Sequence, residues 1–371
     1  MSTPARAGLY VHIPFCLTRC GYCDFNTYAG LDHLAGRYVD MLAQEAELWA
    51  ADWQGTEFVS LFVGGGTPTT LPASRLVKLL DQLRETFSLL PEAEITSEAN
   101  PDTVDEPYLG ALLDAGVTRL SMGVQSFDTE VLAALERIHS PESAIRAFAA
   151  SRAAGFGNVN LDLIYGADGE TLASWQRTLE RAIDLGPEHL SCYALTIEPA
   201  TPLGRKVGAG LVPPPDPELQ ADMYELACAA LAEAGYEHYE VSNWARPGHR
   251  CLHNLGYWDG RPYLGLGAGA HSYRDEKRWW NVRPPQQYID SVTKGGKPVG
   301  GEERLTEDER RLERLLLGLR VCDGVPAGWV DGARAEAFLA EGLATRIGDR
   351  VALTDRGLFL ANELVLELAG P

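Results

Sequence analysis

The chain has 371 residues, of which 45% are hydrophobic and 23% are charged. This composition is typical of a globular protein of two or three domains and excludes a disordered or fibrous chain. Acidic residues outnumber basic ones by 52 to 32, which gives a net charge of -20. We therefore expect no binding to nucleic acid and repulsion from anionic lipid surfaces. No secretory signal or membrane-length apolar run is apparent, so we expect a cytoplasmic protein without a transmembrane segment.

The first half of the sequence alternates short apolar runs with segments of helical periodicity. This alternation predicts an α/β domain with a parallel sheet, and it leaves open whether that sheet is flat or curled into a partial barrel. The predicted strands are residues 9–13, 58–63, 94–98, 119–123, 159–164 and 189–195, and the predicted helices are residues 34–48, 76–87, 109–116 and 175–186.

The second half begins with a proline-rich break at residues 211–217, which we interpret as a linker. A helix is predicted at 219–235, an irregular region at 236–300 and a charged helix at 302–321. A final helix, a two-stranded hairpin and another helix suggest a winged-helix-like module, although a helical cap with one hairpin fits equally well. We therefore predict three domains, at residues 1–211, 212–300 and 301–371.

Three of the seven cysteines lie within eight residues, in the order Cys16-x-x-x-Cys20-x-x-Cys23. Three thiolates on one loop can surround a metal centre, and the odd number of cysteines disfavours a disulfide framework. Structural zinc usually takes four protein ligands, and no fourth ligand stands at zinc-finger spacing. We therefore favour a [4Fe-4S] cluster, with one iron left open, over structural zinc.

A glycine-rich turn, Gly64-Gly65-Gly66-Thr67-Pro68, follows the second predicted strand. Together with the cysteine loop, this turn resembles the radical SAM superfamily, which has a partial (β/α)6 barrel. The resemblance implies a [4Fe-4S] cluster on Cys16, Cys20 and Cys23 whose open iron binds S-adenosylmethionine for reductive cleavage. It also implies that Gly65, Gly66 and Thr67 contact the methionine part of that cofactor.

Further polar residues match the cofactor-contacting positions of the HemN-like branch of this superfamily. Glu98, Gln125 and Asp162 end predicted strands, where barrel proteins gather their ligand-binding side chains. Tyr10 and Arg137 match as well. Taken singly, each could be a helix cap or a buried hydrogen-bonding residue. The carboxylates would suit the ribose hydroxyls of the cofactor, and Arg137 would suit its carboxylate group.

Two kinds of HemN-like protein remain open, a heme chaperone and an oxygen-independent coproporphyrinogen III oxidase. The oxidase carries a further cysteine where this chain has Phe25, and it has an N-terminal segment for which Cys16 lies too close to the start. Residues 253–258 fit the HNxxYW motif of the heme chaperones. The resemblance therefore favours a chaperone that passes heme to apoproteins. A homodimer is left open.

In that motif, the neutral imidazole of His253 is our candidate for the heme-iron ligand, with Cys251 as the alternative. The aromatic rings of Tyr257 and Trp258 are expected to pack on the porphyrin. The competing interpretation is a structural histidine beside a small aromatic core.

Overall fold

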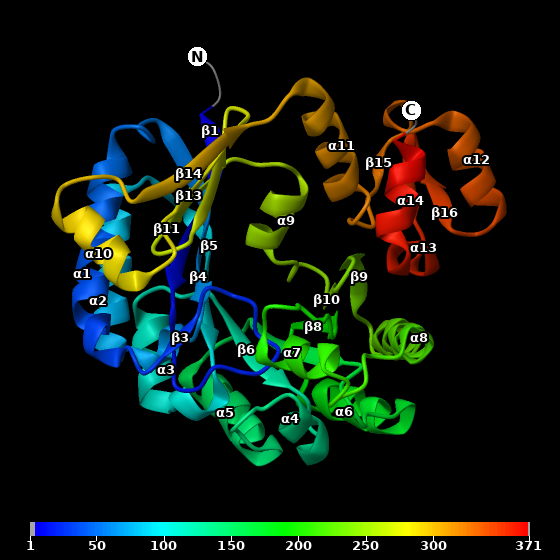
Figure 1. The fold of residues 1–371 in the computed structure, drawn as a ribbon, viewed down its shortest axis with the longest axis horizontal. Helices are drawn as coiled ribbons and strands as arrows, with labels where there is room; N and C mark the ends of the chain where they lie inside the picture. Colours follow the sequence, from blue (N-terminus) through cyan, green and yellow to red (C-terminus); the bar gives the residue numbers. More distant parts are fainter. Residues whose placement is uncertain (1–3, 370–371) are drawn as a thin grey trace.

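A twelve-stranded sheet forms the centre of the molecule, which is described over residues 4–369 by a computed structural model (Figure 1). Six of its seven parallel strands are the six that the sequence predicts, and the seventh, Tyr263–Leu266, pairs with the first of them. Among the described residues, the first and last strands of the sheet do not pair with each other, so the sheet is not a closed barrel. In sheet order the six predicted strands are β1 (Ala5–Ile13), β4 (Thr56–Gly65), β5 (Leu89–Ala99), β6 (Arg119–Gln125), β7 (Val159–Tyr165) and β8 (His189–Ala194).

Helices cover the outer face of this sheet, and the apolar strand residues pack against them in one large core. The four predicted helices are confirmed. We made no prediction for α4, α5 and α7. The buried residues of α5 are alanines and serines apart from Phe148, and α4 and α7 are only six and seven residues long, so their periodicity is weak. The helices are α1 (Asp32–Ala50), α2 (Ala73–Thr86), α3 (Glu106–Asp114), α4 (Thr129–Ala134), α5 (Pro141–Ala154), α6 (Leu172–Leu185), α7 (Pro202–Gly208) and α8 (Pro217–Glu233).

The region 236–300, which we expected to be irregular, consists largely of short strands that extend the same sheet on both sides. β11 pairs with β1 in parallel, and β10 pairs with β8 in antiparallel orientation. Strands of three to six residues are too short to show a clear alternation. The elements are β9 (Glu237–Glu240), β10 (Asn243–Ala245), α9 (Leu252–Trp258), β11 (Tyr263–Leu266), β12 (His271–Arg274), β13 (Lys277–Asn281), α10 (Pro285–Thr293) and β14 (Val299–Arg304).

Because residues 212–300 share both the sheet and the core of the first half, the structure does not separate them as a domain. The predicted helix at 302–321 was also wrong at its start. Lys277 and Arg278 form ion pairs with Glu302 and Glu303 across two neighbouring strands, which holds the charged segment in β14. The helix begins only after Thr306, whose side chain caps it.

The C-terminal region from α11 onward has its own hydrophobic core and stands to one side of the sheet (Figure 1). The predicted hairpin is confirmed, and a third short strand joins it. This order of helix, strand, helix and hairpin agrees with a winged-helix-like module. Its elements are α11 (Glu307–Gly318), β15 (Val325–Pro326), α12 (Gly332–Ala340), β16 (Ala344–Ile347), β17 (Arg350–Leu353), α13 (Asp355–Phe359) and α14 (Ala361–Leu368).

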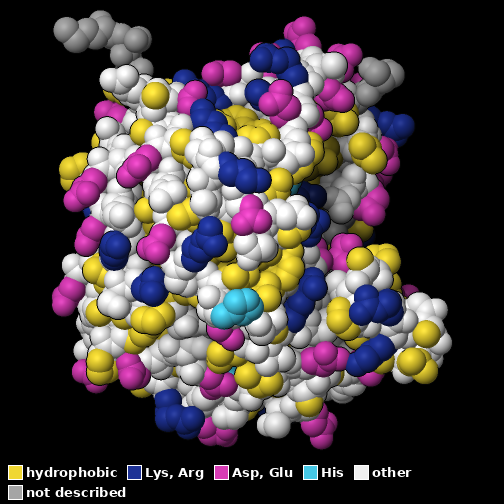
Figure 2. Space-filling model, turned by 60° about the vertical axis from the view of Figure 1, so that its left-hand side comes forward, with side chains coloured by type: hydrophobic (Ala, Val, Ile, Leu, Met, Phe, Trp, Pro, Cys, Tyr) yellow, Lys and Arg dark blue, Asp and Glu magenta, His cyan; other side chains and the backbone are white. Residues whose placement is uncertain are grey.

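The surface carries charges of both signs. On the face shown in Figure 2, acidic and basic side chains are intermingled, with apolar side chains between them. Among residues 4–369, no helix combines the length and the apolar character needed to cross a membrane.

Candidate functional site

A cavity of about 370 Å³ lies at the carboxyl ends of the parallel strands, where the cysteine loop covers the sheet. We call it the cluster pocket. It brings together ten of the twelve predicted site residues, although they are spread over more than 140 positions of the chain. These are Cys16, Cys20, Cys23, Gly65, Gly66, Thr67, Glu98, Gln125, Arg137 and Asp162. Tyr10 and His253 lie elsewhere.

The three cysteines of the loop are free and partly buried, and each sulfur has a hydrogen-bonding partner. Thr67 donates to Cys16 Sγ at 3.7 Å, Arg137 Nη1 donates to Cys20 Sγ at 3.4 Å, and the Thr27 hydroxyl lies 3.6 Å from Cys23 Sγ. Burial raises the pKa of Cys16 to about 11. A bound metal deprotonates such thiols, and donors around the sulfurs then stabilise the thiolates. The loop therefore fits an iron–sulfur centre.

The glycine turn after β4 allows the backbone to approach the pocket closely. A side chain at Gly65, whose φ is +111°, would collide with the His12 ring, and one at Gly66 would meet the Phe15 carbonyl oxygen at 2.6 Å. The Gly65 amide donates to Glu98 Oε2 at 2.9 Å. Only glycine satisfies these contacts, which explains the run of glycines in physical terms.

Glu98, near the end of β5, and Asp162, in the middle of β7, both line the cluster pocket. Burial, followed by the charge of Asp162, raises the pKa of Glu98 to about 7. Burial also raises the pKa of Asp162, whose oxygens accept hydrogen bonds from Ser121 and Asn160. Two half-buried carboxylates at one wall are suited to accept hydrogen bonds from ligand hydroxyls.

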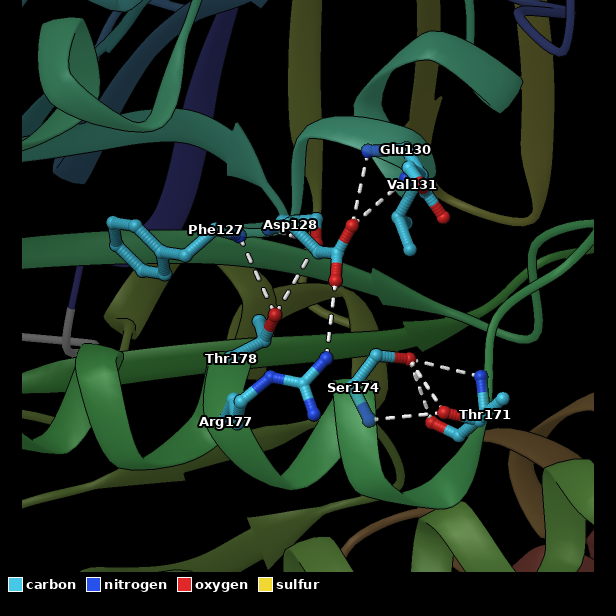
Figure 3. A network of polar contacts seen from close by, with 9 residues as sticks. Phe127, Asp128, Glu130, Val131, Thr171, Ser174, Arg177 and Thr178 are labelled. Atoms are coloured by element: carbon cyan, nitrogen blue, oxygen red, sulfur yellow. Dashed lines mark hydrogen bonds and ion pairs between the residues drawn. The ribbon is translucent and has the colours of Figure 1, made fainter.

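Gln125 ends β6 with a φ of +66°, next to a bulge in the pairing of β6 with β7. The loop that follows is fixed by α6, as Figure 3 shows. Thr178 Oγ1 accepts from the Phe127 amide at 3.4 Å, and Arg177 donates to Asp128 at 3.4 Å. The loop that follows the unusual backbone at Gln125 is thus held by contacts with α6.

Arg137 is positioned by a chain of hydrogen bonds. Its Nη2 donates to the Gly123 carbonyl at 2.7 Å, and its Nε donates to His139 Nδ1 at 3.3 Å. His139 Nε2 in turn donates to the Val124 carbonyl at 2.8 Å. Burial and the Arg137 charge lower the pKa of His139 to about 4, so this imidazole is neutral. The guanidinium is therefore fixed beside Cys20 and faces the pocket.

Tyr10 and His253 line a second cavity of about 200 Å³, which shares Glu98 and Asp162 with the cluster pocket. We call it the inner cavity. The Tyr10 hydroxyl donates to His12 Nδ1 at 2.8 Å, because His12 Nε2 donates to the Asn26 carbonyl at 2.9 Å. Tyr10 therefore orients His12, which packs under the glycine turn.

His253 is only 3% exposed, and both of its ring nitrogens are engaged. Nδ1 lies 2.9 Å from the Ser60 hydroxyl, and Nε2 lies 3.0 Å from the Tyr257 hydroxyl. The ring stacks on Phe62 at 5.1 Å, and burial lowers its pKa to about 3. This geometry matches the competing interpretation of a structural histidine. Iron could be bound only after one of the two hydrogen bonds is broken.

Cys251 is also enclosed. It is fully buried, its thiol donates to Glu94 Oε1 at 3.4 Å, and burial raises its pKa to about 12. The same carboxylate accepts from the amides of Leu252 and His253 and so caps α9. Tyr257 contacts His253 inside the protein, and the Arg320 guanidinium lies 5.6 Å from the Trp258 ring. The expected porphyrin-packing face is thus occupied by protein.

Sequence reasoning missed Arg119, which is 1% exposed at the inner cavity. Its charge lowers the pKa of the neighbouring Glu98 and Asp162 against the effect of burial. It also missed Asn160, which donates to Asp162, and Tyr193 at the rim shared by both cavities. Arg119 begins an apolar strand, and an isolated arginine within such a run is the one signal that could have revealed it.

Comparisons with known proteins identify the family of the chain. The radical SAM superfamily model matches residues 10–182. The chain is 45% identical to the heme chaperone HemW of Mycobacterium tuberculosis (strain CDC 1551 / Oshkosh), over 98% of this chain and 95% of that protein. It is 38% identical to HemW of Escherichia coli (strain K12), over 97% of this chain and 98% of that one.

The fold has a solved counterpart. Coproporphyrinogen III oxidase (HemN) from Escherichia coli, described as a radical SAM enzyme, superposes with a TM-score of 0.84 at 27% identity. The match covers 99% of this chain and 90% of that one. The structural match to HemN and the sequence match to HemW therefore both extend over nearly the whole chain. The chain belongs to the HemW family of the radical SAM superfamily.

Proposed function

We propose that this protein is a cytoplasmic heme chaperone that binds heme and transfers it to heme-requiring apoproteins, such as those of the respiratory chain. The observation that carries the proposal is the 45% identity to HemW over 98% of the chain. Phe25 adds support, because it stands where the related oxidase has a cysteine, and it is 64% exposed at the mouth of the cluster pocket.

We further propose that Cys16, Cys20 and Cys23 hold a [4Fe-4S] cluster and that the cluster pocket holds S-adenosylmethionine. The donor set fits: three sulfurs meet at one cavity, and each has a hydrogen-bonding partner. When bound, the pair supplies one-electron chemistry at the sulfonium. The glycine turn would accept the amino group, Arg137 the carboxylate, and Glu98 with Asp162 the ribose hydroxyls. Gln125 completes the wall, and Tyr10 acts through His12.

His253 remains our proposed heme ligand, on the condition that α9 rearranges. Iron at Nε2 would replace the hydrogen bond to Tyr257. The test is a heme titration of wild type and the His253→Ala and Tyr257→Phe variants. Ligation by His253 predicts a changed Soret spectrum and weaker binding in His253→Ala. It also predicts binding at least as tight in Tyr257→Phe, where the competing hydroxyl is absent. An unchanged spectrum in His253→Ala would remove the residue as ligand.

The second candidate function is oxygen-independent coproporphyrinogen III oxidase, which the TM-score of 0.84 to HemN favours. Anaerobic incubation of the cluster-loaded protein with reductant, S-adenosylmethionine and coproporphyrinogen III separates the two. The chaperone proposal expects no protoporphyrinogen, whereas an apo-heme protein mixed with the heme-loaded chain should acquire heme. Turnover without heme transfer would reverse the assignment.

We also propose that the cluster-bearing and motif-bearing segments work as one unit, with the module from α11 onward as the separable part. The division rests on the separate C-terminal core. If this division is right, a truncated variant that ends at residue 305 should still retain the cluster when it is expressed.

A further inference from the structure

Three residues that could bind a metal meet at the seam between the sheet region and the C-terminal module. Cys228 lies on α8, His238 on β9, and Asp355 is the first residue of α13. One ligand atom from each lies within 4.8 Å of the other two. These residues are separated by up to 127 positions and belong to neither of the cavities described above.

The His238 ring is held firmly in this group. Its Nδ1 lies 2.7 Å from Asp355 Oδ1, and the ring stacks on Trp244 at a centroid distance of 4.3 Å and an angle of 8°. The side chain is 10% exposed. The second nitrogen, Nε2, is buried without any hydrogen-bonding partner. A buried nitrogen left unsatisfied costs free energy, so protein groups satisfy only one of the two ring nitrogens of His238.

The chemistry of the three residues differs from that of an ordinary ion pair. An ordinary ion pair between His238 and Asp355 involves no third group, but the Cys228 thiol lies within 4.8 Å of the ligand atoms of both residues. Thiolate, imidazole and carboxylate are the three ligand types that bind Zn²⁺, and their atoms lie about 3.3–3.8 Å apart around a tetrahedral ion. The Asp355 oxygen lies 2.7 Å from His238 Nδ1, and because the Asp355 side chain is 60% exposed, a shift of about 1 Å would open this contact to the required separation. The Cys228 sulfur, within 4.8 Å of both, would approach by about 1 Å.

We propose that Cys228, His238 and Asp355 form a Zn²⁺ site that fastens the C-terminal module to the sheet region. Water takes the fourth position, because the site opens to solvent on the Asp355 side. On binding, the Cys228 thiol releases its proton to solvent, whereas the neutral imidazole of His238 binds through one ring nitrogen and keeps its proton on the other. The ion would strengthen a seam now held by contacts such as the Arg250–Asp323 ion pair at 3.4 Å.

The test uses the full-length protein, purified anaerobically with its cluster loaded, exposed to zinc chloride and then desalted. Wild type should retain one zinc per chain in addition to the cluster iron. The X-ray absorption spectrum at the zinc edge should show one sulfur at about 2.3 Å and nitrogen or oxygen at about 2.0–2.2 Å. Zinc should also raise the melting temperature of the C-terminal module.

Two variants and one matched control decide the matter. Cys228→Ser and Asp355→Ala should each lower zinc affinity by more than the roughly 10- to 100-fold that outer-shell changes cost, while the iron content stays unchanged. Cys322→Ser is the control, since Cys322 is a partly buried cysteine of the same seam outside the three-residue group. Wild type without retained zinc would overturn the proposal. Equal retention by Cys228→Ser, or loss in Cys322→Ser, would overturn this ligand set.

Discussion

The cysteine loop and the HNxxYW segment are both compact sequence motifs, but the structure treats them in opposite ways. The loop presents three partly exposed sulfurs to a cavity, with hydrogen-bonding partners behind them. The HNxxYW segment turns His253 inward and satisfies both of its nitrogens with protein hydroxyls. A motif therefore identifies a family in both cases, but it identifies an available donor atom only in the first.

The strongest test of this contrast is removal of one loop sulfur. Cys20→Ser should lose essentially all cluster iron and sulfide, because two thiolates cannot replace three around a cluster. Iron and sulfide analysis of anaerobically purified protein measures the loss. Cys192→Ser is the control, since Cys192 is buried in the sheet core and should retain the cluster. Full iron content in Cys20→Ser would show that the loop does not hold the cluster.

Arg137 tests whether the groups behind the sulfurs also bind the cofactor. Arg137→Met removes hydrogen bonds to Cys20 Sγ and to the Gly123 carbonyl while keeping an unbranched side chain. We expect S-adenosylmethionine affinity to fall about 10- to 100-fold, the value of one or two charged hydrogen bonds. Calorimetric titration of the cluster-loaded variant measures this, and unchanged affinity would separate the residue from cofactor binding.

His253 tests the other side of the comparison. His253→Ala should lower the free energy of unfolding by about 3 kcal/mol, because it opens a cavity and leaves the Ser60 and Tyr257 hydroxyls unpaired. Tyr257→Phe, which removes one hydrogen bond and keeps the ring, should cost only about 1 kcal/mol. Denaturant unfolding gives both values. A His253→Ala variant as stable as wild type would contradict the structural role shown by the hydrogen bonds.

The carboxylate shared by the two cavities predicts a pH effect. The pKa of Glu98 is raised from 4.5 to about 7, so the protonated carboxyl favours the folded state. That stability is complete below about pH 4.5 and is lost as the pH rises through about 7. Glu98→Gln should therefore flatten the pH dependence of unfolding of the unloaded protein between about pH 5 and 8.

Glu170→Gln is the matched control for that measurement. Burial raises the pKa of Glu170 to about 7 as well, but this residue lies outside the cluster pocket. Both variants should flatten the stability profile, whereas only Glu98→Gln should weaken S-adenosylmethionine binding. Equal effects of the two variants on binding would show that Glu98 acts through general stability alone.

The smallest expected effect concerns the support of Gln125. Thr171 caps α6, the helix whose Thr178 and Arg177 hold the loop after β6 (Figure 3). Thr171→Ala should cost about 1 kcal/mol of stability. Because the loop has further contacts, S-adenosylmethionine affinity should change by less than about twofold. Thermal unfolding and titration measure the two quantities, and a large loss of affinity would make α6 part of the binding machinery.

The sequence alone determined the features that depend on neighbouring residues. The six buried strands follow from short apolar runs, the cysteine loop from spacing within eight residues, and the C-terminal hairpin from the turn at residues 348–350. Local chemistry is sufficient in these cases because the residues that cooperate are close in the chain. Ten of the predicted site residues meet at one pocket although they are far apart in the chain, because parallel strands end at a common edge where the loops that follow them gather.

Only the tertiary structure decided what depends on partners far away. His253 is satisfied by Ser60, which is 193 residues distant, and α9 is capped by Glu94 from β5. The strands of residues 236–300 exist because the edges of a sheet formed elsewhere accept them. The Cys228, His238 and Asp355 group joins three separate segments. No periodicity records such meetings, because they are set by how the sheet and the module pack together.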